Sequence, residues 1–402
     1  MANLTSPEAS ALEHAADAPM LAQVERWAAV NSGTGNLQGL AQVAGMLADG
    51  FAALPGDVLL VEPEPVESVT VAGQVRTIQR GHHLHLRVRP DAPVQVLLTG
   101  HMDTVFGAEH PFQLMKWLEP GVLNGPGTAD MKGGISVILA ALSAVEASPL
   151  AARIGYDVLI NSDEETGSQA SASLIAELAK GKTAALTYEP ALPDGTLAGA
   201  RPGSGNFSIT LHGKAAHAGR NPDDGRNALI AAADLAMRLN AAKSSGLKVN
   251  PARIDGGGPN NIVPDLAILR VNLRPMTPDD MVMAAEMIRV AVAAVEKEHG
   301  VHAHVHGGFN RPPKPLDAQA EKLFGLVRDC GADLGIPIAW KSTGGVCDGN
   351  NIAACGVPVV DTMGPRGGSI HSDAEFLIVD SLAERARLST LTLLRLAAKS
   401  GL

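Results

Sequence analysis

Short apolar runs recur along the first half of the chain and again near its C-terminal end. Residues 94–100, 156–160, 183–188 and 358–363 each have the length and composition of a buried strand. Residues 135–145 form a longer apolar segment of helical length. Strand and helix patterns alternate in this way up to about Arg201. We therefore expect an α/β domain in this part of the chain.

A second pattern occupies residues 206–306. Its order is strand (207–211), helix (226–242), strand (266–273), helix (281–299) and strand (301–306). A proline-rich segment, 311–315, follows as a stiff linker, and helix 318–334 resumes the first pattern. The 402 residues, with 46% hydrophobic content, suffice for two cores. We expect residues 1–201 and 311–402 to form one domain, with residues 202–310 as a smaller inserted α+β domain.

Acidic and histidine side chains follow the apolar runs, where α/β sheets place their functional sites. Glu164 and Glu165 are the most informative pair, because adjacent like charges at a strand end repel each other unless a cation lies between them or one holds a proton. A divalent metal satisfies both conditions. Asp103, two residues after a histidine in an extended segment, is placed to orient that imidazole ring. The further candidate ligands are His101, Asp130, Glu189 and His371.

Each of these residues also has a simpler explanation. A single histidine after a strand is usually a hydrogen-bonded structural residue, and an aspartate in a glycine-rich turn usually caps a helix. The joint occurrence of two histidines and three carboxylates after strands favours a metal site instead. Imidazole and carboxylate ligands without thiolate suit zinc, with cobalt or manganese as substitutes.

The order of these motifs carries a family resemblance. His-x-Asp, Gly-x-x-x-Asp-x-Lys-Gly-Gly, Glu-Glu-x-Gly-Ser, Tyr-Glu-Pro, His-Ala-Gly and a late His-Ser-Asp follow one another between about Leu97 and His371. This order resembles the M20 family of dizinc metallopeptidases and aminoacylases, and within it the glutamate carboxypeptidase (carboxypeptidase G2)-like branch. The resemblance implies a mixed-sheet zinc-peptidase catalytic domain with an inserted, smaller α+β lid and dimerisation domain.

The resemblance also implies a role for each candidate in the metal site. It implies two zinc ions per chain, bridged by Asp130. One ion would also be bound by His101 and Glu189, and the other by Glu165 and His371. Asp103 would orient His101, and Glu164 would be the catalytic base. The peptide bond after the bridging aspartate, between Asp130 and Met131, would be cis.

His217 belongs to the His-Ala-Gly motif of the inserted domain. By the resemblance it would reach across a homodimer interface and stabilise the oxyanion in the partner's active site. Its simpler explanation is a histidine on a surface turn.

A substrate carboxylate calls for a cation, and arginine offers a bidentate one. The resemblance places Arg311, Arg274 and Asn261 at substrate-binding positions, with an ordinary ion pair as the alternative for the arginines. Gly344 and Gly345, in the glycine-rich segment 343–351, are expected to hold substrate through backbone groups. The glutamate-specific branch carries a lysine between the acidic ligand and the lid. Residues 191–200 contain no lysine and only Arg201 is near, so a preference for glutamate is left open.

The net charge of the chain limits the classes of molecule that it can bind. A formal net charge of -10 and a pI near 5.7 argue against binding to nucleic acid or to a membrane surface. The first ten residues lack the basic and apolar regions of a signal peptide, and we expect no apolar run long enough to span a bilayer. Three cysteines, an odd number, fit free thiols in a reducing cytoplasm.

These features together predict a dinuclear zinc hydrolase that cleaves an amide bond beside a free carboxylate. The favoured form is a carboxypeptidase that releases a C-terminal amino acid, glutamate among the candidates, from a peptide or an N-acyl conjugate. An N-acyl-amino-acid deacylase or desuccinylase with the same machinery is the nearest alternative. A catalytically silent binding protein on the same scaffold is the third. Its mark would be the loss of Glu164 or of a ligand, and all are present.

Overall fold

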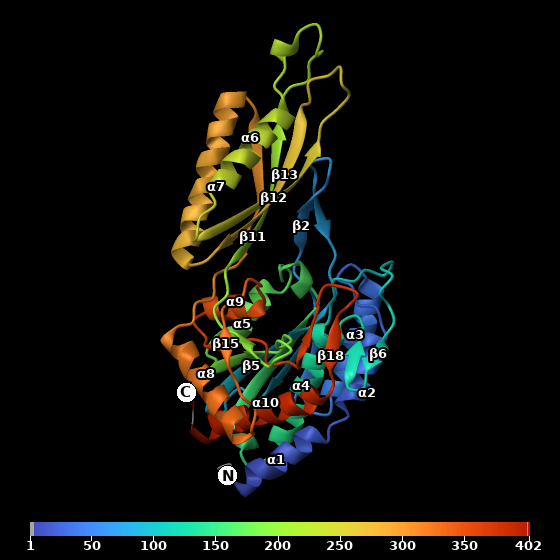
Figure 1. The fold of residues 1–402 in the computed structure, drawn as a ribbon, viewed down its shortest axis with the longest axis vertical. Helices are drawn as coiled ribbons and strands as arrows, with labels where there is room; N and C mark the ends of the chain where they lie inside the picture. Colours follow the sequence, from blue (N-terminus) through green and yellow to red (C-terminus); the bar gives the residue numbers. More distant parts are fainter. Residues whose placement is uncertain (1–3, 400) are drawn as a thin grey trace.

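The computed structural model describes residues 4–399 and 401–402 and consists of two parts joined end to end (Figure 1). The lower part in this view holds both ends of the described chain and a six-stranded sheet. The upper part is formed by the segment in the middle of the sequence. We call the lower part the catalytic domain and the upper part the inserted domain.

The large sheet of the catalytic domain has the strand order β1-β4-β8-β5-β9-β16. From β8 to β16 neighbouring strands run parallel, whereas β1 with β4 and β4 with β8 pair antiparallel. The predicted mixed-sheet α/β fold is therefore confirmed. The strands are β1 (Asp57–Val61), β4 (His83–Val88), β8 (Ile154–Asn161), β5 (Val94–His101), β9 (Ala184–Thr187) and β16 (Val359–Val360).

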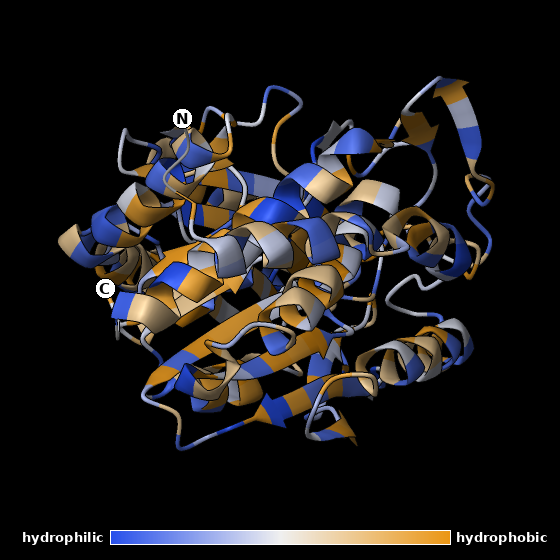
Figure 2. Cartoon of the chain, turned by 90° about the horizontal axis from the view of Figure 1, so that it is seen from below, coloured by the Kyte–Doolittle hydropathy of each residue, from blue (hydrophilic) through white to orange (hydrophobic). Residues whose placement is uncertain are grey.

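Helices cover both faces of this sheet. Val96 and Leu98 of β5 face the main core, whereas Leu97 between them faces a smaller core on the opposite side. Because both faces are buried, such strands appear in the sequence as continuous apolar runs. Strands in Figure 2 are mostly hydrophobic in colour, and the covering helices are mixed. The main core includes α1 (Ser6–Ala16), α2 (Met20–Ala28), α3 (Leu37–Phe51), α4 (Gly134–Glu146), α8 (Ala318–Asp333) and α10 (Asp380–Lys399), and the smaller core includes α5 (Ala172–Ala179) and α9 (Asp348–Ala354).

Helix α4 corrects one expectation from the sequence. The segment Thr128–Glu146 is long and apolar enough to span a bilayer by length and composition, although no such segment was expected. In the structure, 94% of this segment lies inside the protein. Its apolar character follows from packing between the sheet and helices α1, α2 and α10.

The inserted domain has a four-stranded antiparallel sheet in the order β12-β13-β11-β14. Two helices pack on it and enclose a separate hydrophobic core that runs from Phe207 to Val301 (Figure 1). The threonine before the second helix caps it, because the Thr277 side chain accepts a hydrogen bond from the Asp280 backbone. The elements are β11 (Ser204–His212), α6 (Ala228–Ala241), β12 (Leu247–Gly256), β13 (Leu266–Pro275), α7 (Pro278–His299) and β14 (His302–Arg311).

Strand β12 was missing from the pattern predicted for this domain. It lies at the sheet edge, buries Leu247 and Val249, and leaves many of its other side chains exposed. Pro251 stands inside it, and the pairing register shifts between Pro251 and Arg253. A proline in an apolar run argues against a central strand, but an edge strand tolerates it. Tertiary pairing with β13 therefore decides the structure of this segment.

A small second sheet brings two distant segments of the catalytic domain together. Its strand order is β17-β18-β7-β6, and β18 pairs with β7 so that Phe376 stands opposite Asn124. The turn after β7 leads to Asp130, and the turn between β17 and β18 contains His371. The strands are β6 (Lys116–Glu119), β7 (Val122–Asn124), β17 (Gly367–Gly368) and β18 (Phe376–Ile378), while β10 (Leu197–Ala198) and β15 (Trp340–Lys341) form a separate parallel pair.

A hairpin of the catalytic domain reaches up to the inserted domain. It consists of β2 (Val66–Val69) and β3 (Val75–Ile78) and stands beside the inserted sheet in Figure 1. Arg270 of β13 donates a hydrogen bond to the Val69 carbonyl oxygen over 2.9 Å. The His306 ring of β14 lies 3.4 Å from the Glu67 carbonyl oxygen. The hairpin thus links the two domains at a place other than the chain crossings.

Candidate active site

The candidate ligands meet at the carboxyl-terminal edge of the parallel strands. His101 ends β5, Glu164 and Glu165 follow β8, and Glu189 follows β9. His371 comes from the turn after β17. Parallel strands bring their carboxyl ends to one edge of a sheet, which is why residues so far apart in sequence converge here.

Asp130 approaches this edge from the side. It lies in the irregular turn before α4, and the peptide bond between Asp130 and Met131 is cis, as the resemblance implied. The turn begins at Gly127, whose φ of 70° is a left-handed conformation that favours glycine. Asp130 is buried, with 4% of its surface exposed.

The first group of ligand atoms surrounds His101. Its Nε2 lies 3.1 Å from Asp130 Oδ1 and 3.6 Å from Glu189 Oε2. Its other ring nitrogen, Nδ1, lies 3.0 Å from the Asp103 carbonyl oxygen and 3.4 Å from the Asp103 carboxylate. Asp103 therefore orients the ring chiefly through its backbone. The Asp103 carboxylate accepts hydrogen bonds from the Glu164 and Glu165 backbone nitrogens instead, each over 3.2 Å.

The second group surrounds His371. Its Nε2 lies 3.3 Å from Asp130 Oδ2 and 3.1 Å from Glu165 Oε2. Asp130 thus offers one oxygen to each imidazole. Two ligands of one tetrahedral zinc ion, at bond lengths of about 2.1 Å, stand roughly 3.4 Å apart. The spacing and the chemistry of the donor atoms therefore fit two ions that share Asp130.

Electrostatics also favours a cation at this place. Burial and the neighbouring Asp130 raise the pKa of Glu165 to about 7, and burial raises the pKa of Glu189. Hydrogen bonds to Asp130 and Glu165 raise the pKa of His371 to about 11. Without a metal ion, some of these side chains must stay protonated to relieve the repulsion among the carboxylates. A divalent ion relieves the same repulsion without them.

Glu164 lies near His101 and Glu189 and is paired with an arginine. Its Oε1 lies 2.7 Å from Arg311 Nη2, and the same nitrogen donates to the Glu164 carbonyl oxygen over 3.0 Å. Arg311 Nη1 donates to Asp348 over 2.9 Å. Burial raises the pKa of Glu164 well above its ordinary value, although Arg311 opposes this. A carboxylate with a raised pKa beside a metal site is suited to accept a proton.

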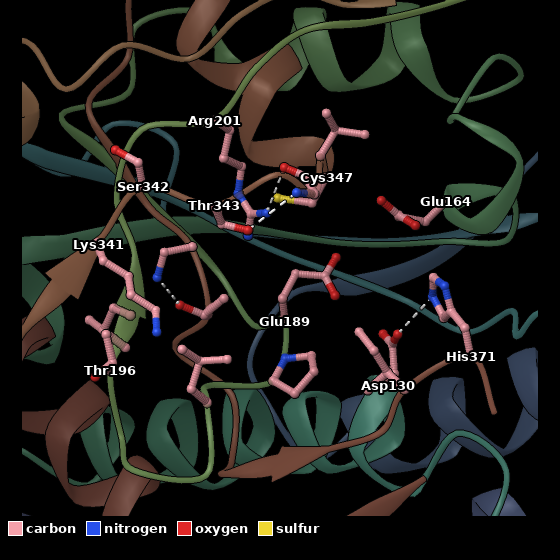
Figure 3. A pocket seen from close by; sticks show the side chains of 18 residues that line it. Asp130, Glu164, Glu189, Thr196, Arg201, Lys341, Ser342, Thr343, Cys347 and His371 are labelled. Carbon is pink, nitrogen blue, oxygen red and sulfur yellow. Dashed lines mark hydrogen bonds and ion pairs between the residues drawn. The ribbon is translucent and has the colours of Figure 1, made fainter. Parts of the chain in front are cut away.

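Two cavities adjoin the ligands. The larger, of about 370 Å³, is lined by Asp130, Glu189 and Arg201, and its apolar wall includes Leu192 and Leu197. Figure 3 shows Glu164, Glu189, Asp130 and His371 around one part of this cavity and Lys341 and Thr196 at the other.

The smaller cavity, of about 220 Å³, includes Arg311 and Asn310. Glu164, Val346 and His371 line both cavities. Glu164 therefore stands between two spaces.

Only some of the predicted substrate-binding residues line the two cavities. Arg311 ends strand β14, is 3% exposed and lines the smaller cavity. Arg274 donates to the Gly344 carbonyl oxygen over 2.9 Å, which joins the inserted domain to the glycine-rich segment. Gly345 lines the larger cavity, and its carbonyl oxygen accepts a hydrogen bond from Arg201 over 3.1 Å. Arg201 itself is paired with Asp361.

His217 and Asn261 lie elsewhere. Neither lines the two cavities, both are exposed, and the Ala218 backbone nitrogen donates to the Asn261 carbonyl oxygen over 2.9 Å. In Figure 1 their segments belong to the loops at the far end of the inserted domain. Within one chain, therefore, His217 does not join the ligand groups, and its role stays a prediction.

Sequence reasoning missed three residues that matter here. Asp348 is 2% exposed and accepts hydrogen bonds from Arg311, Asn161 and Ser168. Lys341 lines the larger cavity because β15 pairs with β10. Glu375 is buried behind Asp130. Single charged residues of this kind carry no signal in the sequence, because their partners lie far away along the chain.

The sequence of this chain matches a known protein family. A family model described as peptidase family M20/M25/M40 matches residues 97–395. The chain belongs to this peptidase family. M20 membership makes it a metal-dependent hydrolase, and the predicted M20 resemblance is confirmed.

Individual relatives differ in the reactions that their names give. The chain is 28% identical to carboxypeptidase G2 from Pseudomonas sp. (strain RS-16), over 93% of this chain and 88% of the relative. It is 29% identical to a succinyl-diaminopimelate desuccinylase from Xylella fastidiosa (strain M23), over 77% and 85% respectively. A dinuclear metal-binding M20 peptidase from Bacillus subtilis has a similar structure, with a TM-score of 0.66, 14% identity and coverage of 94% and 98%.

The two adjacent glutamates should respond differently to the same substitution. Glu164→Gln should retain bound metal and lose roughly 10²–10⁴-fold in turnover, because only the proton acceptor is removed. Glu165→Gln should also weaken metal binding, because it removes a ligand atom beside His371. Metal analysis after dialysis and steady-state kinetics would separate the two effects. Normal metal binding in both variants, with the larger kinetic defect in Glu165→Gln, would reverse the assignment.

Metal binding should release protons in a way that depends on pH. In the metal-free protein the raised pKa values leave His371 protonated at neutral pH and Glu165 protonated below about 7. Because ligands must lose these protons, affinity should rise between about pH 6 and about pH 8, and fewer protons should be released at the upper end. Calorimetry in buffers of different ionisation enthalpy measures the number of protons released when metal binds. Glu165→Gln is the control that should flatten the change near pH 7.

Proposed function

We propose that this protein is a dinuclear zinc carboxypeptidase that releases a C-terminal amino acid from a peptide or an N-acyl conjugate. The observation that carries the proposal is the sharing of Asp130 between two ligand groups, with Glu164 beside them. Two zinc ions per chain, replaceable by cobalt or manganese, suit this mixture of imidazole and carboxylate. Bound zinc would polarise the scissile carbonyl group and acidify a water molecule.

The side chains around the ligands supply the remaining chemistry. Glu164 accepts a proton from the attacking water and delivers it to the leaving amine. Arg311, fixed by Asp348, holds Glu164 in place over 2.7 Å. Asp103 holds the His101 ring and, through its carboxylate, the backbone of both adjacent glutamates. These contacts keep the base and the ligands in one geometry before substrate binds.

A cation in the larger cavity supports a substrate that bears a carboxylate. Arg311, in the smaller cavity, is already paired with Glu164 and Asp348. Lys341 lines the larger cavity and is exposed, and within the described part of the chain it has no hydrogen bond or ion pair at its ammonium group. Hydrogen bonds from Thr196 lower the pKa of Asp194, and the nearby Lys341 charge lowers it further. A free cation at the far side of an apolar cavity suits a substrate that ends in an anionic group.

That same lysine favours a second candidate function. An N-acyl-amino-acid deacylase or desuccinylase needs room for an acyl group, and a succinyl group ends in a carboxylate. The larger cavity, with Leu192 and Leu197 on its wall and Lys341 beside Thr196, offers such room. The 29% identity to a desuccinylase supports this candidate as well.

The proposal includes a location in the cytoplasm and a small-molecule substrate. All three cysteines are free, and burial raises the pKa values of Cys330 and Cys347. Free thiols suit the cytoplasm. The acidic net charge supports a small-molecule substrate instead of nucleic acid or a membrane surface.

A matched substrate panel tests the proposed activity. Zinc-loaded enzyme would be given dipeptides, N-benzoyl amino acids and N-succinyl amino acids with the same C-terminal residue, and release of the free amine would be measured. Carboxypeptidase activity predicts cleavage of the first two classes, whereas a desuccinylase would strongly prefer the third. A chelator should abolish the activity, and zinc or cobalt should restore it. Undiminished turnover by metal-free protein would overturn both candidates.

We further propose a homodimer in which His217 acts in the partner's active site. The exposed position of His217, away from the ligand groups of its own chain, supports this arrangement. Exposed apolar side chains on the inserted domain, among them Ile230, Met237 and Val290, support an interface there.

Mixing two inactive variants tests the exchange of His217 between subunits. His217→Ala should keep its metal and lose turnover more than substrate affinity, because an oxyanion donor acts mainly in the transition state. Mixed with Glu164→Gln, it forms heterodimers in which one site has both residues intact. Activity should recover to about a quarter of all sites when subunits exchange freely at equal amounts. Demonstrated exchange without recovery would assign His217 to its own chain or to no catalytic role.

A further inference from the structure

Glu375 occupies a position that the metal site does not account for. It follows His371 by four residues and is 1% exposed, although it carries a carboxylate. A buried carboxylate is costly unless hydrogen bonds replace its water. Its partners therefore reveal what this side chain does.

Every polar partner of the Glu375 carboxylate among the described residues is a backbone nitrogen of the turn that carries Asp130. Oε1 accepts hydrogen bonds from Ala129 N over 3.0 Å and from Asp130 N over 3.1 Å. Oε2 accepts one from Gly127 N over 3.1 Å. These nitrogens lie in the irregular turn ahead of helix α4, which begins only at Gly134. The carboxylate and the backbone N–H groups thus satisfy each other in a place that water does not reach.

The backbone of Glu375 contacts the same turn. Its carbonyl oxygen accepts a hydrogen bond from Asn124 Nδ2 over 2.6 Å and lies 3.4 Å from Gly125 N. The pairing of β18 with β7, which puts Phe376 opposite Asn124, sets this register. One residue thus binds the turn at both of its ends.

Asp130 is consequently held from two sides by one short segment. His371 lies 3.3 Å from its carboxylate, and Glu375 accepts a hydrogen bond from its backbone nitrogen. The segment from His371 to Glu375 therefore determines how the Asp130 carboxylate is aimed. A small rotation of this carboxylate would change its distances to His101 and His371 together.

We propose that Glu375 is a positioning residue that fixes the Asp130 turn relative to His371, so that one carboxylate serves two metal ions. This rests on the proposed use of Asp130 and His371 as ligands. Glu375 is not itself a ligand: its oxygens are taken by backbone donors, and it belongs to neither group of candidate metal-binding side chains among the described residues.

Three variants of the full-length protein test this role. Glu375→Ala removes all three carboxylate bonds. Glu375→Gln is milder, since its amide oxygen can keep the bonds to Ala129 and Asp130 while its NH₂ group meets the Gly127 N–H. Asp373→Asn is the matched control, because it removes one negative charge from the same segment at an exposed position.

The main measurement is metal affinity, by competition with a chelator, for zinc and for cobalt. Glu375→Ala should lose about 10–100-fold in affinity, Glu375→Gln less, and Asp373→Asn should bind like the wild type. The visible absorption spectrum at saturating cobalt should change in both Glu375 variants, because the ligand geometry at Asp130 changes. Thermal melting of the metal-free variants identifies any loss of folding, and Glu375→Gln decides the question if Glu375→Ala fails to fold.

Wild-type affinity and an unchanged cobalt spectrum in Glu375→Gln, together with a lowered melting temperature, would overturn the proposal, since Glu375 would then support the fold only. An equal loss of affinity in Asp373→Asn would also overturn it, because charge alone would explain the effect. The measurements use metal and no substrate. Failure of the carboxypeptidase proposal would therefore be recognised separately, in the substrate panel.

Discussion

Two imidazole rings approach opposite oxygens of one buried carboxylate, and the rest of the structure makes that arrangement possible. Asp130 lies 3.1 Å from His101 and 3.3 Å from His371. The large sheet supplies His101 at the end of β5, whereas the small sheet supplies the His371 turn next to the Asp130 turn. Neither sheet alone would form the site. The irregular turn that carries Asp130 contacts both β5 of the large sheet and β18 of the small sheet.

The environment of Glu164 shows how the protein separates two adjacent carboxylates. Glu165 lies with His371, whereas Glu164 is paired with Arg311, which Asp348 holds in turn. Each carboxylate thereby receives a different electrostatic partner although the residues are neighbours in sequence. Such a difference allows one to serve as a ligand and the other to exchange a proton.

Strands that are buried on both faces could be recognised in the sequence. Strands that form only because a neighbouring strand pairs with them could not. Strands β5 and β8 are buried on both faces, so their apolar runs and the ligands that follow them could be predicted. The two helices of the inserted domain, α6 and α7, could be predicted from their periodicity. Edge strand β12, with Pro251, and the two-residue pair β10 and β15 could not, because their sequences carry no strand signal of their own. Glu375 and Lys341 remained unnoticed for the same reason.

The hairpin of β2 and β3 has a consequence for motion between the domains. Within the described residues, the chain crosses between them near residues 203 and 312, and two such crossings can act as a hinge. Noncovalent contacts also join the domains, at Val69 and Glu67 of the hairpin and between Arg274 and Gly344. Swinging the inserted domain away would break these contacts, and a hydrogen bond contributes only about 1 kcal/mol. These contacts therefore favour some domain angles over others, and a ligand that binds another angle more tightly would shift the population toward it.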